Sequence, residues 1–324
     1  MQQRFFFGSL TVALLMCAVM VDAELADTWS PGGRLGEVLS RGSLIPLLFA
    51  GIILAGCREM NRLMRSAGLQ PHARIATVMS LVLLLSPWLC ATRLVGLSLT
   101  DVDGLRWQLI WLVVLLMVTV GAQLVRGVSG AAVADLGATW LMALYLGLLP
   151  SFAMQLRSDP YIPGPDAAWL VFAFLLITKA SDIGAYLVGT TMGRHKLMPA
   201  VSPGKSVEGA VGGVIGSVLV ALLLWRLYFV GDYLMSDQPG EVANLSRMTA
   251  AFGSLELWQV TVFGLLMSIF GQVGDLFESL LKRVARKKDS AAIVPGYGGV
   301  LDLIDSPVLA APVAWFLLTV WWEM

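Results

Sequence analysis

The chain has 324 residues, of which 57% are hydrophobic and only 14% charged, and its mean hydropathy is +0.77. This is too little polar surface to cover a water-soluble globule of this size. The 22 basic and 22 acidic residues cancel to a formal net charge of zero, so no global excess of positive charge favours nucleic acid. We therefore expect an integral membrane protein and no nucleic-acid partner.

Apolar runs long enough for a helix to cross a hydrocarbon core of about 30 Å recur along the sequence. Because the alternating pattern of a β-barrel is not seen, we predict an all-α fold, a polytopic transmembrane bundle of about nine helices. The second span is short, and polar residues interrupt the sixth. The expected spans are residues 5–22, 43–57, 75–93, 107–125, 131–152, 167–181, 207–230, 257–277 and 301–322.

The basic residues are unevenly divided between the two sides of this topology. With a cytoplasmic N-terminus, 15 of the 22 fall on the cytoplasmic side and 7 on the other, which agrees with the positive-inside rule. The first span has the basic start and apolar middle of a signal peptide. We expect it to be retained, because its removal would change the side on which the basic loops lie.

The two halves of the chain differ in their polar content. Residues 1–165 form a divergent N-terminal set of membrane helices with few polar groups in their spans, and residues 166–324 form the expected catalytic transmembrane domain. Ionisable groups at membrane depth are costly and usually face a polar cavity. Those of the second half are Lys179, Asp182, Glu208, Asp275, Glu278, Asp302 and Asp305.

The segment 178–213 leaves the membrane through glycine-rich chain and re-enters it after "SPGKSVEG". Ser202 and Lys205 lie in a stretch with the form of a helix N-terminus, where free N–H groups and the helix dipole favour a phosphate. The alternative is a loop and a capped helix, in which glycines serve close helix packing. The glycine pairs are Gly209/Gly213 and Gly212/Gly216.

A second polar stripe lies in "FGQVGDLFESLLKR", residues 270–283. On a helix, Asp275, Glu278, Ser279 and Lys282 follow at i, i+3, i+4 and i+7 and therefore share one face. A deep carboxylate with a lysine two turns later suits a metal ion beside a phosphate. The alternative for Lys282 and Arg283 is that both extend towards anionic lipid at the membrane surface.

The third segment combines a basic run, the turn "VPGYGG" and two aspartates. Asp302 and Asp305, spaced i and i+3, share a face in the first turns of the last helix, where they could also simply complement the dipole. Together with Asp275 they form the hard-oxygen arrangement that suits Mg²⁺ and a polyphosphate. In this interpretation the basic run binds phosphates and the glycines let the backbone approach them.

These segments resemble the CDP-diacylglycerol synthases, or phosphatidate cytidylyltransferases. The resemblance covers roughly residues 165–324 and includes "SDIGAYLVG" and "SPGKSVEGAVGG". The family's C-terminal motif, S-x-[aliphatic]-K-R-x4-K-D-x-[small]-x2-[LIF]-P-x-H-G-G-x-x-D-R-x-D, is matched in register at Ser279, Leu281, Lys282, Arg283, Lys288, Asp289, Ala291, Pro295, Gly298, Gly299, Asp302 and Asp305.

The resemblance implies a nucleotidyltransferase of phospholipid biosynthesis that converts CTP and phosphatidate into CDP-diacylglycerol and pyrophosphate. It implies Mg²⁺ as cofactor, leaves a second cation and a homodimer open, and implies a bacterial inner membrane with the site facing the cytoplasm. The implied catalytic residues are Asp275, Asp302, Lys282 and Lys205, and the metal ligands are Asp275, Asp302 and Asp305. The implied substrate-binding residues are Ser202, Lys205, Ser279, Lys282, Arg283, Lys288, Asp289, Gly298 and Gly299.

Three positions depart from the family motif: Val294 replaces a bulkier apolar residue, Tyr297 replaces His, and Leu303 replaces Arg. The last two remove potential phosphate-binding groups beside the aspartates. Other functions therefore stay open. They are a related CTP-dependent polyprenol or phytol kinase, a divergent non-catalytic paralogue, and a membrane transporter or binding protein.

Overall fold

The computed structural model describes residues 16–25, 42–92, 104–158, 164–235, 254–287, 290 and 298–323. Within these residues, eight helical segments are long and apolar enough to cross a membrane, and the fold is nearly all α-helical, as predicted. They coincide with the second to ninth expected spans, although the second, which was expected to be short, is a helix of 23 residues, Leu44–Ser66. Most of the first expected span lies outside the described residues, although residues 16–25 are helical.

The helices run through most of the described chain. They are α3 (Leu44–Ser66), α4 (Ala73–Ala91), α5 (Gly104–Arg126), α6 (Ala132–Ala143), the π-helical turn η1 (Leu144–Leu148), α7 (Leu149–Arg157), α8 (Gly164–Met192), α9 (Val207–Met235), α11 (Leu257–Val284) and α12 (Leu301–Glu323). The strands β1 (Lys196–Met198) and β2 (Ser202–Ser206) form an antiparallel hairpin. Since α6, η1 and α7 are continuous, they form one span.

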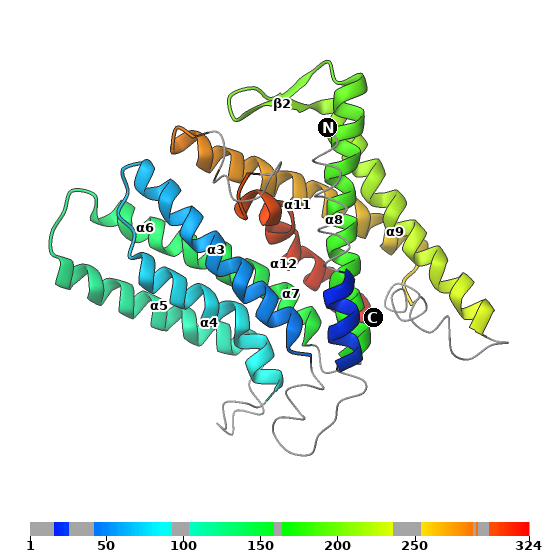
Figure 1. The fold of residues 1–324 in the computed structure, drawn as a ribbon, viewed down its shortest axis with the longest axis horizontal. Helices are drawn as coiled ribbons and strands as arrows, with labels where there is room; N and C mark the ends of the chain where they lie inside the picture. Colours follow the sequence, from blue (N-terminus) through cyan, green and yellow to red (C-terminus); the bar gives the residue numbers. More distant parts are fainter. Residues whose placement is uncertain are drawn as a thin grey trace.

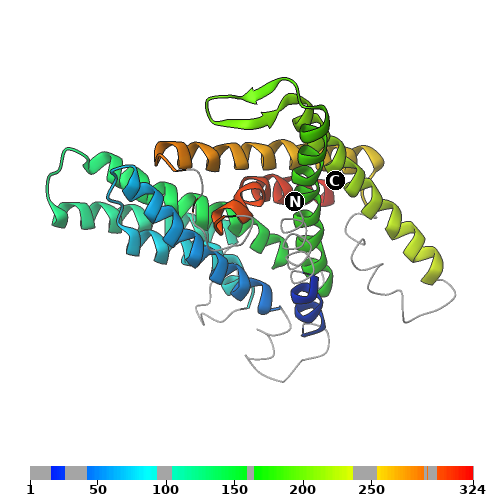
Figure 2. The ribbon, with the colours of Figure 1, turned by 45° about the horizontal axis from the view of Figure 1, so that its top comes forward.

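Figures 1 and 2 show α3 to α6 side by side in one group, with α8 and α9 on the other side of α12. Helix α11 packs along α12 and crosses α8 and α9, and α7 packs against α12. One continuous core of buried apolar side chains, including Met60, Leu146, Phe174 and Phe263, joins both groups. The two parts of the chain before and after residue 165 therefore share one hydrophobic core.

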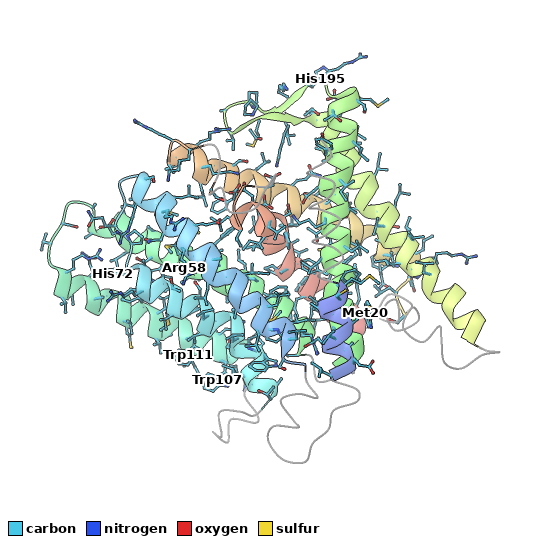
Figure 3. All side chains as sticks on the ribbon, viewed as in Figure 1. Met20, Arg58, His72, Trp107, Trp111 and His195 are labelled. Carbon is cyan, nitrogen blue, oxygen red and sulfur yellow. The ribbon has the colours of Figure 1, made fainter. Side chains whose placement is uncertain are left out.

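The two ends of the bundle differ in chemistry. Figure 3 shows His195 at the end that carries the hairpin, and Trp107 and Trp111 at the opposite end. The two tryptophan rings are stacked, with their centroids 6.1 Å apart. Tryptophan is typical of the boundary between membrane and water, so these rings suit a membrane surface at this end of α5.

Close packing of α8 on α9 depends on glycine. A Cβ atom on Gly184 would overlap the carbonyl oxygen of Gly212, and one on Gly212 would overlap Val188. Gly209 and Gly216 likewise lie against the backbone of α8. The interpretation of these glycines as helix-packing residues is confirmed, because only residues without a side chain let the two backbones approach so closely.

The predicted helix N-terminus at Ser202 is wrong. Residues Ser202–Ser206 form β2, which pairs with β1. Lys196 of β1 pairs with Ser206, and Met198 of β1 pairs with Ser202. Helix α9 begins only at Val207, and the Ser206 hydroxyl accepts a hydrogen bond of 3.1 Å from the Gly209 amide. Ser206 is thus the capping residue.

The sixth span is also longer and less interrupted than predicted, since α8 continues to Met192. Its polar residues are satisfied within the bundle. The Lys179 ammonium lies 2.9 Å from Asp182 Oδ2, and the Ser306 hydroxyl of α12 lies 3.1 and 3.2 Å from the two oxygens of Asp182, within hydrogen-bond distance of either. Polar groups paired in this way do not need to end a membrane helix.

A buried ion pair connects the segment 16–25 to α7. Arg157 donates from Nε and Nη2 to Asp22 Oδ2 at 2.9 and 2.7 Å, and the two side chains are at most 1% exposed. Asp22 Oδ1 also accepts the backbone amides of Leu44 and Ile45 at the start of α3. Three segments are therefore joined at one carboxylate.

We expect Arg157→Met to destabilise the protein by about 3–5 kcal/mol, because it leaves the Asp22 carboxylate buried without its cation. The measurement is the thermal unfolding midpoint of the detergent-extracted protein. The double variant Asp22→Asn with Arg157→Met should recover part of the loss. A single variant as stable as the wild type would contradict a structural role for this pair.

Candidate active site

The candidate site lies where the last turns of α11 meet the first turns of α12, beside α8 and β2. Gly274 of α11 is so close to the carbonyl oxygen of Asp305 that a Cβ atom would overlap it, and Gly271 packs against Ser306. The backbones of α11 and α12 can therefore approach closely. This approach brings the acidic side chains of both helices together.

Three carboxylates form the centre of the site: Asp275 and Glu278 from α11 and Asp305 from α12. One oxygen of each lies within 4.8 Å of the others, a spacing that can hold a metal ion. Glu278 is fully buried; its Oε2 is paired with Lys282, whereas its Oε1 has no hydrogen-bond partner among the described residues. Since buried carboxylates need compensation and hard oxygen ligands suit divalent cations, these residues fit such an ion.

Two lysines flank this acidic cluster. Lys205 of β2 places its Nζ 2.7 Å from Asp275 Oδ2. Lys282 of α11 lies 2.5 Å from Glu278 Oε2 and donates to Asp302 Oδ1 at 2.6 Å. The hairpin and both helices are thus joined through charged groups at one place.

Helix α8 contributes a third lysine. Lys179, besides its bond to Asp182, lies 3.8 Å from Asp305 Oδ1. The carboxylates of the site therefore outnumber its ammonium groups, five to three. The carboxylates are Asp182, Asp275, Glu278, Asp302 and Asp305, and the ammonium groups are Lys179, Lys205 and Lys282. A bound cation would offset this excess of negative charge.

Asp302, predicted as a metal ligand, occupies a different position from Asp275 and Asp305. Its Oδ1 accepts from Lys282, and its Oδ2 accepts from Ser290 Oγ at 2.7 Å and from the Gly299 amide at 2.8 Å. Glu278 completes the group of three instead. The predicted polar face of residues 270–283 included Glu278. The spacing of residues along the sequence could not show which aspartate of α12 faces α11.

The structure describes some of the other predicted residues. Ser202 lies at the start of β2, Ser279 is buried on α11, and Arg283 Nε donates to the Val201 carbonyl at 3.1 Å, which joins α11 to the hairpin. Gly298 adopts a positive φ of 104°, as only glycine does readily. Lys288, Asp289, Val294 and Tyr297 lie outside the described residues.

Sequence reasoning missed Glu59 of α3, which belongs to the half that was expected to be generic. Its carboxylate accepts hydrogen bonds from the amides of Val300 and Leu301, each at 2.9 Å, beside Asp302. The signal was present as the one acidic residue in "CREMNRLMRS". It was hidden because the surrounding arginines were interpreted only as topology signals.

The sequence of this chain is similar to those of known proteins. The profile of the cytidylyltransferase family matches residues 35–321. Phosphatidate cytidylyltransferases from Staphylococcus saprophyticus and Staphylococcus haemolyticus are 39% and 38% identical over 174 residues, which are 54% of this chain and 55% of theirs. The alignment thus spans about half of these relatives. The phosphatidate cytidylyltransferase of Bacillus subtilis is 29% identical over 285 residues, 86% of this chain and 95% of its own.

Proposed function

We propose, since the chain belongs to the cytidylyltransferase family, that it converts CTP and phosphatidate into CDP-diacylglycerol and pyrophosphate. The observation that carries the proposal is the acidic cluster of Asp275, Glu278 and Asp305 between Lys205 and Lys282. These residue types suit two phosphate groups and a divalent cation. The names of the relatives supply the substrates.

In this reaction a phosphate oxygen of the lipid attacks the α-phosphorus of CTP. The bond from the α-phosphorus to the bridging oxygen breaks, and the electron pair leaves with pyrophosphate. A phosphomonoester is already anionic at neutral pH, so no residue has to remove a proton from it. The contribution of the protein is positioning and charge neutralisation.

The residues divide these tasks between them. Asp275, Glu278 and Asp305 would hold Mg²⁺, which when bound neutralises phosphate charge. Lys205 and Lys282 would bind phosphate oxygens, and the hairpin would hold Lys205 over the site. Asp302 would orient Lys282 through their 2.6 Å hydrogen bond. The predicted roles of Ser202, Ser279, Arg283, Lys288, Asp289, Gly298 and Gly299 in substrate binding belong to the same proposal.

We infer that the hairpin end of the bundle faces the cytoplasm of a bacterial cell, where CTP is available. On a background with Cys17, Cys57 and Cys90 replaced by alanine, we expect Lys196→Cys and Lys287→Cys to react with a membrane-impermeant maleimide only in inside-out vesicles. Ser254→Cys at the other end should react only in right-side-out vesicles. Labelling of the Lys196→Cys or Lys287→Cys variant from outside would contradict this orientation.

The proposed activity is tested with purified protein, phosphatidate, Mg²⁺ and CTP labelled at either the α- or the γ-phosphorus. Cytidylyl transfer places the α-label in the lipid and releases the γ-label as pyrophosphate. A lipid kinase would instead place the γ-label in a prenol or phytol lipid and release CDP. If neither label enters lipid under conditions in which a control synthase is active, the proposed function is wrong.

A further inference from the structure

Glu59 is a buried acid in a helix otherwise assigned to the divergent half of the chain. It lies on α3 and is 1% exposed. Its Oε1 accepts a hydrogen bond from the Val300 amide, and its Oε2 accepts one from the Leu301 amide. The first amides of a helix have no acceptor within it, and the positive end of the dipole favours a carboxylate there. Glu59 therefore caps α12 from another helix.

The same carboxylate is linked to the candidate site through Ser290. The Ser290 hydroxyl lies 3.2 Å from Glu59 Oε2 and 2.7 Å from Asp302 Oδ2. A hydroxyl has one proton, so Ser290 donates to one of these carboxylates at a time, and the shorter distance is the one to Asp302 Oδ2. A Cβ atom on Gly299 would overlap both Ser290 and Glu59, so glycine is required at this point of contact.

We propose that Glu59 is a positioning residue of the active site. By holding the first amides of α12, it fixes the rotation of that helix and with it the places of Asp302 and Asp305. Asp302 in turn holds Lys282. This inference rests on the proposed function, and it gives the N-terminal half a direct part in the chemistry of the C-terminal half.

The test compares Glu59→Gln with Asp22→Asn. Glutamine keeps the shape but offers an N–H₂ donor where the wild type has an acceptor. Asp22 is a matched control, because it is equally buried, also accepts two successive amides at the start of a helix, and lies in another part of the bundle. Two quantities are measured on purified, folded protein: kcat for cytidylyl transfer, and the Mg²⁺ concentration that half-saturates the rise in thermal midpoint.

We expect Glu59→Gln to lower kcat by about tenfold or more, a loss typical of one misplaced catalytic contact. It should also raise the half-saturating Mg²⁺ concentration, since Asp305 shares the helix that Glu59 caps. Asp22→Asn should lower the thermal midpoint at least as much as Glu59→Gln does. Its kcat and its half-saturating Mg²⁺ concentration should stay at wild-type values. This difference separates positioning from general stability.

A second variant, Ser290→Ala, removes the bridge without a change in α3 and decides the matter if Glu59→Gln does not fold. The kcat of Ser290→Ala should fall. Where Glu59→Gln folds, the double variant of Glu59→Gln with Ser290→Ala should lose less kcat than the product of the two single losses. Wild-type kcat and Mg²⁺ response in Glu59→Gln, or in Ser290→Ala where Glu59→Gln does not fold, would overturn the inference. A wild-type protein without cytidylyl transfer would end the proposed function instead, and the Mg²⁺ response would then decide the role of Glu59.

Discussion

Asp275→Asn and Glu278→Gln should each reduce cytidylyl transfer to background, the largest effect that we expect from any single change. Both carboxylates belong to the group whose oxygens lie within 4.8 Å of one another. An amide supplies a neutral oxygen in place of a charged one, which removes much of the attraction for a divalent cation. Turnover is measured with α-labelled CTP at saturating Mg²⁺, and folding by size-exclusion profile.

The Glu278 variant tests the structure against the sequence. The family motif predicts Asp275, Asp302 and Asp305 as ligands, whereas the structure gathers Asp275, Glu278 and Asp305. We expect Glu278→Gln to abolish the rise in thermal midpoint that Mg²⁺ produces, and Asp302→Asn to reduce it only partly. If Asp302→Asn abolishes the rise while Glu278→Gln keeps it, Asp302 is a metal ligand and Glu278 is not.

Hydropathy alone located the second to ninth membrane spans, because a helix in lipid must be both long and apolar. It failed where polar groups are satisfied by neighbours distant in sequence. Lys179 and Asp182 were interpreted as an interruption, yet Ser306 of α12 donates to Asp182, and α8 continues for ten residues beyond it. A single sequence gives no sign of such a partner.

The candidate site was predictable to a similar extent. Helical spacing placed Asp275, Glu278 and Lys282 on one face, and the structure has them together with Asp305. That Asp305 and not Asp302 lies in the group with Asp275 and Glu278 was not predictable, because it depends on how α12 is rotated against α11. That rotation follows from the contact of Gly274 with Asp305 and from the cap that Glu59 supplies.

Lys282→Met should lower kcat/KM for CTP by about tenfold or more, roughly the 1.4 kcal/mol of one lost charge-assisted phosphate contact. The Lys282 side chain is 12% exposed and is held between Glu278 and Asp302, so its ammonium is fixed beside the acidic cluster. A fixed charge binds phosphate at a smaller entropic cost than a mobile one. The assay uses purified protein with CTP varied at saturating phosphatidate.

Lys287 provides the matched control. It is exposed in the same basic run, five residues after Lys282, and its backbone amide donates to the Lys282 carbonyl. Lys287→Met removes the same charge from the run but from an exposed, solvated position, so we expect a change of about twofold at most at moderate salt. Equal losses in both variants, both suppressed by added salt, would mean that the basic run attracts CTP only through its overall charge. A loss confined to Lys282→Met, and insensitive to salt, assigns that lysine a specific phosphate contact.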